Sequence, residues 1–405
     1  MAVYFEDVAS ISSVIRGRLT GSPDERRTAE YVDQRLGEFR ISSTTLPFET
    51  PRSWIPPYIV IFVLAALSVP LTRFSGIAGF VISLVAVVLL VLTFAFWTRI
   101  ARRMAKAESQ NVVGLIPARP AKRETSPAPL RRIVLSAHLD TGRTGWLWNP
   151  SLIRWFRPLA LLVFAAVIIL PVLQIIGLFV AGFILWLLSF IPMVILLVAI
   201  ILLLETLVRG VPVAGANDNA SGIAVVLAAA EALRKERPAH LETWILFTGA
   251  EEAGMIGMSA FLEENQFDPD TTYFINVDSV GSGFVRYTFE QGLVLPRRSS
   301  PILVRIAGSI ARSEPKWHVQ PVVQPLLPTD QIVALARGYQ AIGITARDGE
   351  GQIPHWHQAS DTTDQIEAKT METAANFVLA MIRRLDTEAT GGRIHREGSP
   401  ISLGE

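Results

Sequence analysis

A long uncharged stretch most restricts how this chain can fold. Between Arg157 and Glu205 the sequence holds no charged residue. A helix that crosses the hydrocarbon core of a bilayer needs about 20 predominantly apolar residues. The stretch is therefore long enough for two membrane spans, with a reversal expected between Gly177 and Gly182. The alternative is a pair of core hairpins in a soluble protein, which so long an uncharged run disfavours.

A second apolar block precedes this stretch. It extends from Tyr58 to Trp97 and is interrupted at residues 70–76. The arm at 76–97 is long enough for a span, whereas the arm at 58–72 is short and would thin the bilayer locally. We therefore expect about four transmembrane helices in two hairpins. The N-terminus has early acidic residues and no apolar core, so it does not predict a cleaved signal peptide.

Positive charge is concentrated at one end of both predicted hairpins. The turn at the opposite end of the first hairpin carries only Arg73, and that of the second carries no charge. The positive-inside rule then predicts a multi-pass protein of the cell (inner) membrane, with both termini and the non-membrane sequence in the cytoplasm. The flanking basic residues are Arg99, Arg102, Arg103, Lys106, Arg154, Arg157 and Arg209.

The remaining sequence alternates short apolar runs with amphipathic ones. This alternation predicts an α/β fold with three layers, in which helices cover both faces of a mixed, mainly parallel sheet. The expected strands are 111–116, 132–136, 243–247, 273–277 and 341–345. The expected helices are 5–40, with a cap at Ser22, then 221–237, 255–264, 301–312 and 368–385.

These patterns also predict how the chain is divided. The two hairpins interrupt one α/β domain, and the Gly- and charge-rich end is typical of disorder. The expected segments are 1–55 (N-terminal helical part), 56–98 (first hairpin), 99–152 (first strands), 153–208 (second hairpin), 209–386 (main part of the domain) and 387–405 (disordered tail).

Composition excludes several classes of function. The formal net charge is +1 and no run of Lys or Arg interleaves with aromatic residues, so no nucleic-acid partner is expected. The chain contains no cysteine, which excludes disulfides, thiolate metal ligands and a cysteine nucleophile.

Polar residues at the ends of the predicted strands suggest metal chemistry. His138 and Asp140 lie in SAHLDT, on the same side of a strand end. There His138 can bind a metal while Asp140 accepts a hydrogen bond from its far nitrogen. Asp218 lies in GANDNASG, a turn before a helix, where its two oxygens can bridge two cations. A helix cap is the alternative for Asp218.

Two adjacent glutamates follow the next strand. Glu251 and Glu252, in FTGAEEAG, cannot point in the same direction, so one can bind a metal while the other acts as a general base. A solvated acidic pair at a helix start is the alternative. Asp278, in INVDSVG, ends a buried strand, where a lone acidic residue is otherwise hard to explain.

The last motif, PHWHQASDTTD, offers two histidines. His355 and His357 can both be ligands, or one of them is a bystander. His240, His318 and His395 lie in polar segments and are expected at the surface.

Taken in order, these motifs resemble the M28 family of zinc aminopeptidases and carboxypeptidases. The order is H-x-D, G-A-x-D-N-x-S-G, G-A-E-E-x-G, N-x-D and H-x-x-x-D-T. The resemblance covers nearly all the non-membrane sequence, including RLTGSPDERRTAEYV, SQNVVGLIP and PTDQIVALARGYQAIGITA. The two inserted hairpins are departures from the soluble members of the family.

The resemblance implies a site with two Zn²⁺ ions. His138 and Asp278 would hold one ion, Glu252 and His357 would hold the other, and Asp218 would bridge them. Glu251 would be the general base, Asp140 the residue that orients His138, and His355 a contact to substrate. The H-x-x-x-D-T frame selects His357 over His355.

The implied activity is that of a membrane-anchored di-zinc exopeptidase of the aminopeptidase type, which hydrolyses peptide or amide bonds with an activated water. The inserted hairpins add the hypothesis of a site near the membrane, with substrates that are hydrophobic, acylated or released from the bilayer. The alternatives are a glutaminyl-cyclase-like acyl transferase, an N-acyl amino acid amidohydrolase and a non-catalytic membrane scaffold. A transporter is disfavoured because the spans contain no ionisable residue.

Overall fold

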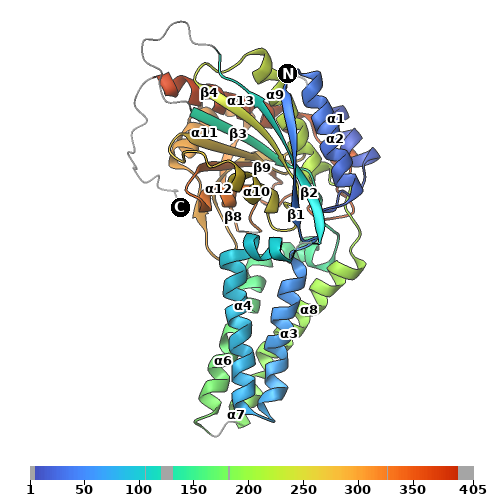
Figure 1. The fold of residues 1–405 in the computed structure, drawn as a ribbon, viewed down its shortest axis with the longest axis vertical. Coiled ribbons are helices and arrows are strands. Elements are labelled where there is room, and N and C mark those ends of the chain that lie inside the picture. Colours follow the sequence, from blue (N-terminus) through green and yellow to red (C-terminus); the bar gives the residue numbers. More distant parts are fainter. Residues whose placement is uncertain (1–4, 105, 120–130, 181–182, 326, 391–405) are drawn as a thin grey trace.

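In a computed structural model the chain forms an α/β domain from which a bundle of long helices projects as a stalk (Figure 1). The structure describes residues 5–104, 106–119, 131–180, 183–325 and 327–390. The stalk leaves one end of the domain, so the long apolar stretches are segregated from the sheet and its covering helices.

The α/β domain is built on one mixed sheet of nine strands in the described residues. The order is β1-β2-β4-β3-β5-β9-β6-β7, and β8 pairs with β6. The central strands β4, β3, β5 and β9 run parallel, whereas β2 and β6 pair antiparallel with this group. The bounds are β1 (Ser42–Thr50), β2 (Ala107–Ile116), β3 (Arg131–His138), β4 (Leu241–Thr248), β5 (Thr272–Val277), β6 (Phe284–Gln291), β7 (Arg297–Arg298), β8 (Gln320–Gln324) and β9 (Gln340–Arg347).

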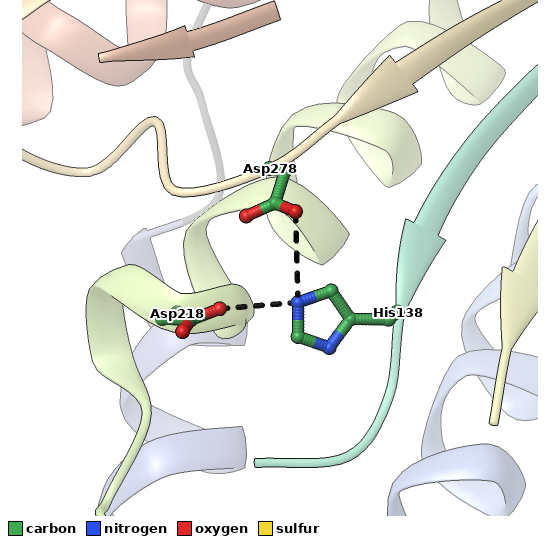
Figure 2. Close-up of side chains that lie close together, drawn as sticks. All are labelled: His138, Asp218 and Asp278. Atoms are coloured by element: carbon green, nitrogen blue, oxygen red, sulfur yellow. Dashed lines mark hydrogen bonds and ion pairs between the residues drawn. The ribbon is translucent and has the colours of Figure 1, made fainter. Parts of the chain in front are cut away.

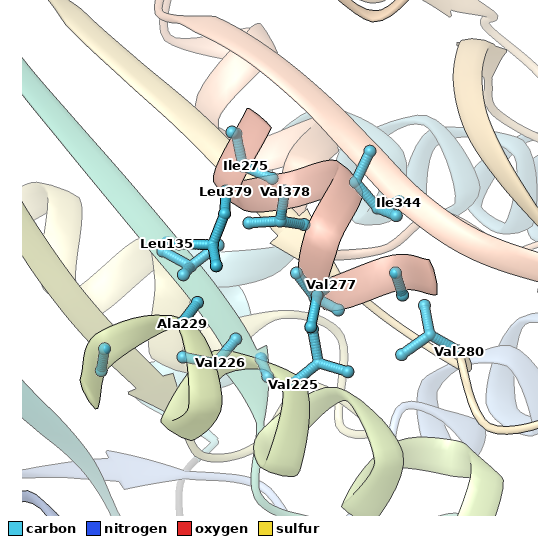
Figure 3. Close-up of a cluster of buried hydrophobic side chains, with 14 of the residues drawn as sticks. Leu135, Val225, Val226, Ala229, Ile275, Val277, Val280, Ile344, Val378 and Leu379 are labelled. Carbon is cyan, nitrogen blue, oxygen red and sulfur yellow. The ribbon is translucent and has the colours of Figure 1, made fainter. Parts of the chain in front are cut away.

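Helices cover both faces of this sheet, because side chains along each central strand alternate between two apolar clusters. On β5, Ile275 and Val277 pack into the larger cluster, while Phe274 packs into the smaller one on the opposite face. Figure 3 shows part of the larger cluster, where α9 and α13 meet the sheet. This mixed three-layer arrangement confirms the predicted α/β fold.

The larger cluster is covered by α1 (Phe5–Ala9), the turn Ser10–Val14, α2 (Pro23–Glu38), α9 (Gly222–Lys235), α11 (Pro301–Ser313) and α13 (Ala368–Thr390). The smaller cluster is covered by α10 (Ile256–Glu264) and α12 (Asp330–Ala336).

Several predicted elements need correction. The helix expected over 5–40 is divided, because Gly17 and Gly21 adopt positive φ between α1 and α2. Ser22 nevertheless caps α2, since its side chain accepts a hydrogen bond from the Glu25 N–H at 3.2 Å. Residues 387–390, expected in a disordered tail, continue α13; the rest of that prediction, 391–405, lies outside the described residues.

The strands β1, β6, β7 and β8 and the helix α12 have no counterpart in the prediction. Strand β1 (SSTTLPFET) lies at the edge of the sheet and is largely exposed, so it lacks the apolar run that identified the central strands. Strand β8 begins with Gln320 and Pro321 and is likewise mostly exposed.

The stalk consists of four long apolar segments, and each is long and apolar enough to cross a membrane by length and composition. Only 28% to 39% of each candidate span is buried inside the molecule, so most of this apolar surface faces outward. The stalk helices are α3 (Ile55–Thr72), α4 (Gly76–Arg103), α6 (Phe156–Gly177), α7 (Phe183–Leu188) and α8 (Phe190–Arg209). The breaks at 73–75 and after Gly177 lie where the sequence predicted them.

Three buried polar residues connect the helices of the stalk. Gln174 on α6 donates to Ser68 Oγ on α3 at 2.8 Å, and Ser83 on α4 donates to Gln174 Oε1 at 2.6 Å. Ser68 also donates to the Ala65 carbonyl of its own helix, and the Ser83 hydroxyl can donate instead to the Phe80 carbonyl of its own helix. Buried polar groups need such partners, and an amide can satisfy two helices at once.

We expect Gln174→Leu to lower the free energy of unfolding in detergent by roughly 1 kcal/mol, since two interhelical hydrogen bonds are lost. The loss is limited because both serines keep their carbonyl partners. Equilibrium unfolding of the purified protein measures it, with outward-facing Ile175→Leu on the same helix as the control. Equal stability of the two variants and the wild type would show that this triad does not hold the stalk together.

Candidate metal centre

The predicted site residues converge at one edge of the sheet. His138 is the last residue of β3, Glu251 and Glu252 follow β4, and Asp278 follows β5. The carboxyl ends of parallel strands meet at the same edge, so residues far apart in sequence become neighbours. Asp218, in the turn Ala216–Ser221 before α9, and His357, after β9, complete the group.

His138, Asp218 and Asp278 form the first triad (Figure 2). His138 Nε2 lies 3.1 Å from Asp218 Oδ1 and 4.0 Å from Asp278 Oδ2. All three side chains are buried, and each offers one atom within 4.8 Å of the others.

Asp218, Glu252 and His357 form the second triad. His357 Nε2 lies 3.0 Å from Glu252 Oε1 and 3.4 Å from Asp218 Oδ2. Asp218 thus presents one oxygen to each imidazole. The structure brings all five predicted ligands together as two triads that share this carboxylate.

The electrostatics of the cluster suit a cation. Against the opposing effect of burial, the carboxylates of Glu252 and Asp218 raise the pKa of His357 to about 10, and those of Asp140 and Asp218 raise the pKa of His138. Burial opposes a low pKa for Asp218, yet hydrogen bonds to both histidines lower it below its ordinary value. The imidazoles therefore lie in a field that favours positive charge. Their nitrogens and the carboxylate oxygens are donors that Zn²⁺ accepts.

The contact between Asp140 and His138 differs in part from the predicted one. His138 Nδ1 lies 3.0 Å from the main-chain oxygen of Asp140, while the Asp140 carboxylate is 3.6 Å away. That carboxylate is occupied by other donors: the Thr20 hydroxyl at 2.6 Å and the backbone N–H groups of Glu251 and Glu252 at 3.0 and 3.1 Å. Asp140 thus fixes the His138 ring through its backbone. Its side chain fixes the loop that carries Glu251 and Glu252, called the glutamate loop below.

The turn that carries Asp218 is held by a second buried carboxylate. Asp361 accepts the backbone N–H of Asn217 at 2.6 Å and that of Asp218 at 3.1 Å. Burial raises the pKa of Asp361 to about 7. The Asp218–Asn219 peptide bond in this turn is cis.

Arg18 is a supporting residue that the site prediction did not include. It is fully buried, and its guanidinium donates to the carbonyls of Leu139, Ala214 and Gly215 at 2.7–3.0 Å. These carbonyls flank the loops of His138 and Asp218, so one cation ties both loops to the N-terminal segment. Its place in RLTGS, within the quoted resemblance, was the available signal.

The glutamate loop rests on another buried acid, Glu25. Its carboxylate accepts the Ala250 N–H at 3.0 Å and the Ser109 hydroxyl at 2.7 Å, next to Glu251. Burial, followed by the nearby carboxylates of Glu252 and Asp330, raises the pKa of Glu251 well above its ordinary value, although His138 opposes this. Asp330, on α12, is a buried neighbour that the site prediction also missed.

The remaining predicted residue, His355, lies in the same loop as His357 but in neither triad. Its Nδ1 lies 2.9 Å from Ser360 Oγ, and the residue is partly exposed. The predicted contact between His355 and substrate therefore stays a prediction.

Part of the chain matches a known peptidase family. Residues 204–382 match the model of peptidase family M28, a segment that contains every triad residue except His138. The probable lipoprotein aminopeptidase LpqL of Mycobacterium tuberculosis is 32% identical over 104 residues, or 24% of this chain. That match spans about a fifth (21%) of the length of LpqL.

Solved structures share the fold at low sequence identity. The zinc aminopeptidase BSAP from Bacillus subtilis is 12% identical with a TM-score of 0.56, and the match covers 94% of this chain and 93% of that one. A Zn-dependent exopeptidase from Parabacteroides distasonis is 16% identical with a TM-score of 0.55, and the match covers 94% of this chain and 97% of that one. The glutaminyl cyclase of Bacteroides thetaiotaomicron is 15% identical with a TM-score of 0.55, and the match covers 94% of this chain and 96% of that one. The chain thus contains a segment that matches a peptidase family, and its fold is that of solved zinc aminopeptidases.

Proposed function

We propose that this chain is a membrane-anchored di-zinc exopeptidase of the aminopeptidase type. The observation that carries the proposal is the pair of triads joined by Asp218, with Glu251 beside them but in neither. A bridged pair of ligand sets is the arrangement expected of a two-metal hydrolase. The M28 match and the aminopeptidase relative support peptide or amide bonds as its substrates.

In this proposal His138 and Asp278 would hold one zinc, Glu252 and His357 would hold the other, and Asp218 would be a ligand common to both sites. When bound, the two ions supply a Lewis acid for the scissile carbonyl and lower the pKa of water. Glu251 takes a proton from the attacking water and delivers it to the leaving amine.

The stalk places this chemistry at a membrane in our proposal. Its four apolar segments cross the cell membrane, and the basic residues that flank them keep the α/β domain in the cytoplasm. The substrates are then peptides or amides that are hydrophobic, acylated or released from the bilayer, with His355 as a contact to them.

A glutaminyl-cyclase-like transferase or an N-acyl amino acid amidohydrolase is the second candidate. The fold shared with the Bacteroides thetaiotaomicron glutaminyl cyclase favours keeping it. A cyclase of this kind needs one zinc, whereas this chain presents two complete triads, which favours hydrolysis. Two zinc ions per chain would therefore argue against the cyclase.

Glu251→Gln is expected to abolish turnover while zinc content stays at the wild-type value. The amide keeps the size of the side chain but cannot accept the proton, and Glu251 belongs to neither triad. Peptide hydrolysis and metal analysis of the same preparation test this, with exposed Glu264→Gln as the matched control. An active Gln variant would exclude Glu251 as the base.

Asp218→Ala is expected to lose both metals, because it removes one oxygen from each triad. Metal analysis after dialysis at controlled free zinc measures this. Asp364→Ala serves as the control, because Asp364 lies on the outside of the loop that follows the site. Retention of two tightly bound ions by Asp218→Ala would exclude the shared carboxylate.

A panel of unblocked, N-acylated and lipid-like amides identifies the substrate class. We expect the protein in lipid to release free amino acids from hydrophobic or acylated substrates faster than from short soluble peptides. Equal rates for soluble peptides and lipid-like amides in detergent would contradict a membrane-derived substrate while leaving the peptidase reaction intact.

A further inference from the structure

The first stalk hairpin reaches the glutamate loop directly. Helix α4 continues past its candidate span, 76–95, and packs on the residues around Glu251 and Glu252. The Trp97 indole N–H donates to the Ala253 carbonyl at 3.2 Å. The backbone of Gly254 approaches this ring so closely that a Cβ there would lie 2.0 Å from Trp97 Nε1. The loop therefore fits against the indole of a stalk helix.

A buried apolar contact strengthens this junction. Ala101 on α4 is fully buried in a cluster with Ala250 and Ala253, which flank the two glutamates, and Trp97 packs against the same cluster. The residues on both sides of Glu251 and Glu252 thus contact α4.

The second stalk hairpin reaches the other ligand of the same triad. The Trp148 ring packs edge-on against His357, with the ring centroids 4.5 Å apart, and stacks at 5.7 Å on Phe156, the first residue of α6. Trp148 is buried, and within the described residues its indole nitrogen has no hydrogen-bond partner. Its contribution is therefore ring contact.

The segment before Trp148 ties this contact to α8. The backbone N–H of Trp146 donates to Glu205 Oε2 at 2.9 Å. A Cβ on Gly145 would lie 2.3 Å from Thr206 Oγ1, so the backbone of this segment lies directly on α8. A Cβ on Gly142 would lie 2.6 Å from His357 Nε2. The segment 142–146 therefore connects the His357 imidazole to α8.

The first triad has a different foundation. His138 ends β3 and Asp278 follows β5, two neighbouring strands in the middle of the sheet. The Asp278 N–H donates to the Ile344 carbonyl of β9 at 2.9 Å. His138 and Asp278 are thus positioned by the sheet, whereas His357 touches Trp148 and the residues that follow Glu252 touch Trp97.

We infer that the stalk positions the second metal subsite, through Trp97 on the Glu252 loop and Trp148 on His357. The two tryptophans are positioning residues and do not bind the metal. Loosening either contact weakens the Asp218–Glu252–His357 subsite and leaves the His138–Asp218–Asp278 subsite in place. This inference rests on the proposed two-metal function. It makes metal occupancy, and hence hydrolysis, depend on the packing of the membrane helices.

The test is a Co²⁺ titration of metal-free, full-length protein in lipid nanodiscs, with equilibrium dialysis and visible spectra to resolve two binding steps. We expect wild type to bind two ions per chain. Trp97→Ala and Trp148→Ala should leave one step at its wild-type affinity and weaken the other by about 10- to 100-fold, the usual effect of removing a residue that supports a ligand. Trp148→Phe, which keeps a ring, should lose less than Trp148→Ala.

The matched control is Trp155→Phe, since Trp155 is an exposed tryptophan in the same region, and it should leave both steps unchanged. Thermal unfolding shows whether each variant is folded, and the Phe variants at 97 and 148 serve if an Ala variant is not. Unchanged binding in both tryptophan variants, or equal weakening of both steps, would overturn the inference but not the proposed function. Wild type binding fewer than two ions would overturn both.

Discussion

The site depends on the contacts that two histidines make with the carboxylate of Asp218. Nε2 of His138, at the end of β3, lies 3.1 Å from one of its oxygens, and Nε2 of His357, after β9, lies 3.4 Å from the other. Both contacts require that the turn carrying Asp218 is fixed at this edge of the sheet. Much of the surrounding polar structure serves that purpose, since Asp361 binds the turn from one side and Arg18 binds the carbonyls before it.

Such supports are buried, and a buried charge is costly unless its hydrogen-bonding groups are satisfied. Arg18 meets this condition with main-chain carbonyls, and Glu25 meets it with backbone N–H groups and a serine hydroxyl. Because these partners belong to loops, each of these buried side chains also fixes a backbone; burial raises the pKa of Glu25 to about 8. The N-terminal segment, which supplies both residues, is thus part of the site.

The sequence predicted the central strands and the ligands for the same physical reason. Strands such as β5 are apolar on both faces, and a polar residue at their ends, such as Asp278, is then conspicuous. Edge strands such as β1 were missed because one face is solvated and their composition resembles that of loops. Residues such as Arg18 and Asp330 were missed because their role comes from contacts with distant segments; for Arg18 the only signal was its place in RLTGS.

The position of the second hairpin has a consequence for how the protein assembles. His138 and Asp218 are 80 positions apart, and the helices α6 to α8 occupy most of that interval. Closing a flexible loop of that length would cost chain entropy. Here the antiparallel helices return the chain to its starting point, where Arg143 pairs with Pro212 in a β-bridge. For the entropy of loop closure, the insertion therefore behaves as a short turn, so helix pairing in the stalk lowers the entropic cost of bringing His138 and Asp218 together.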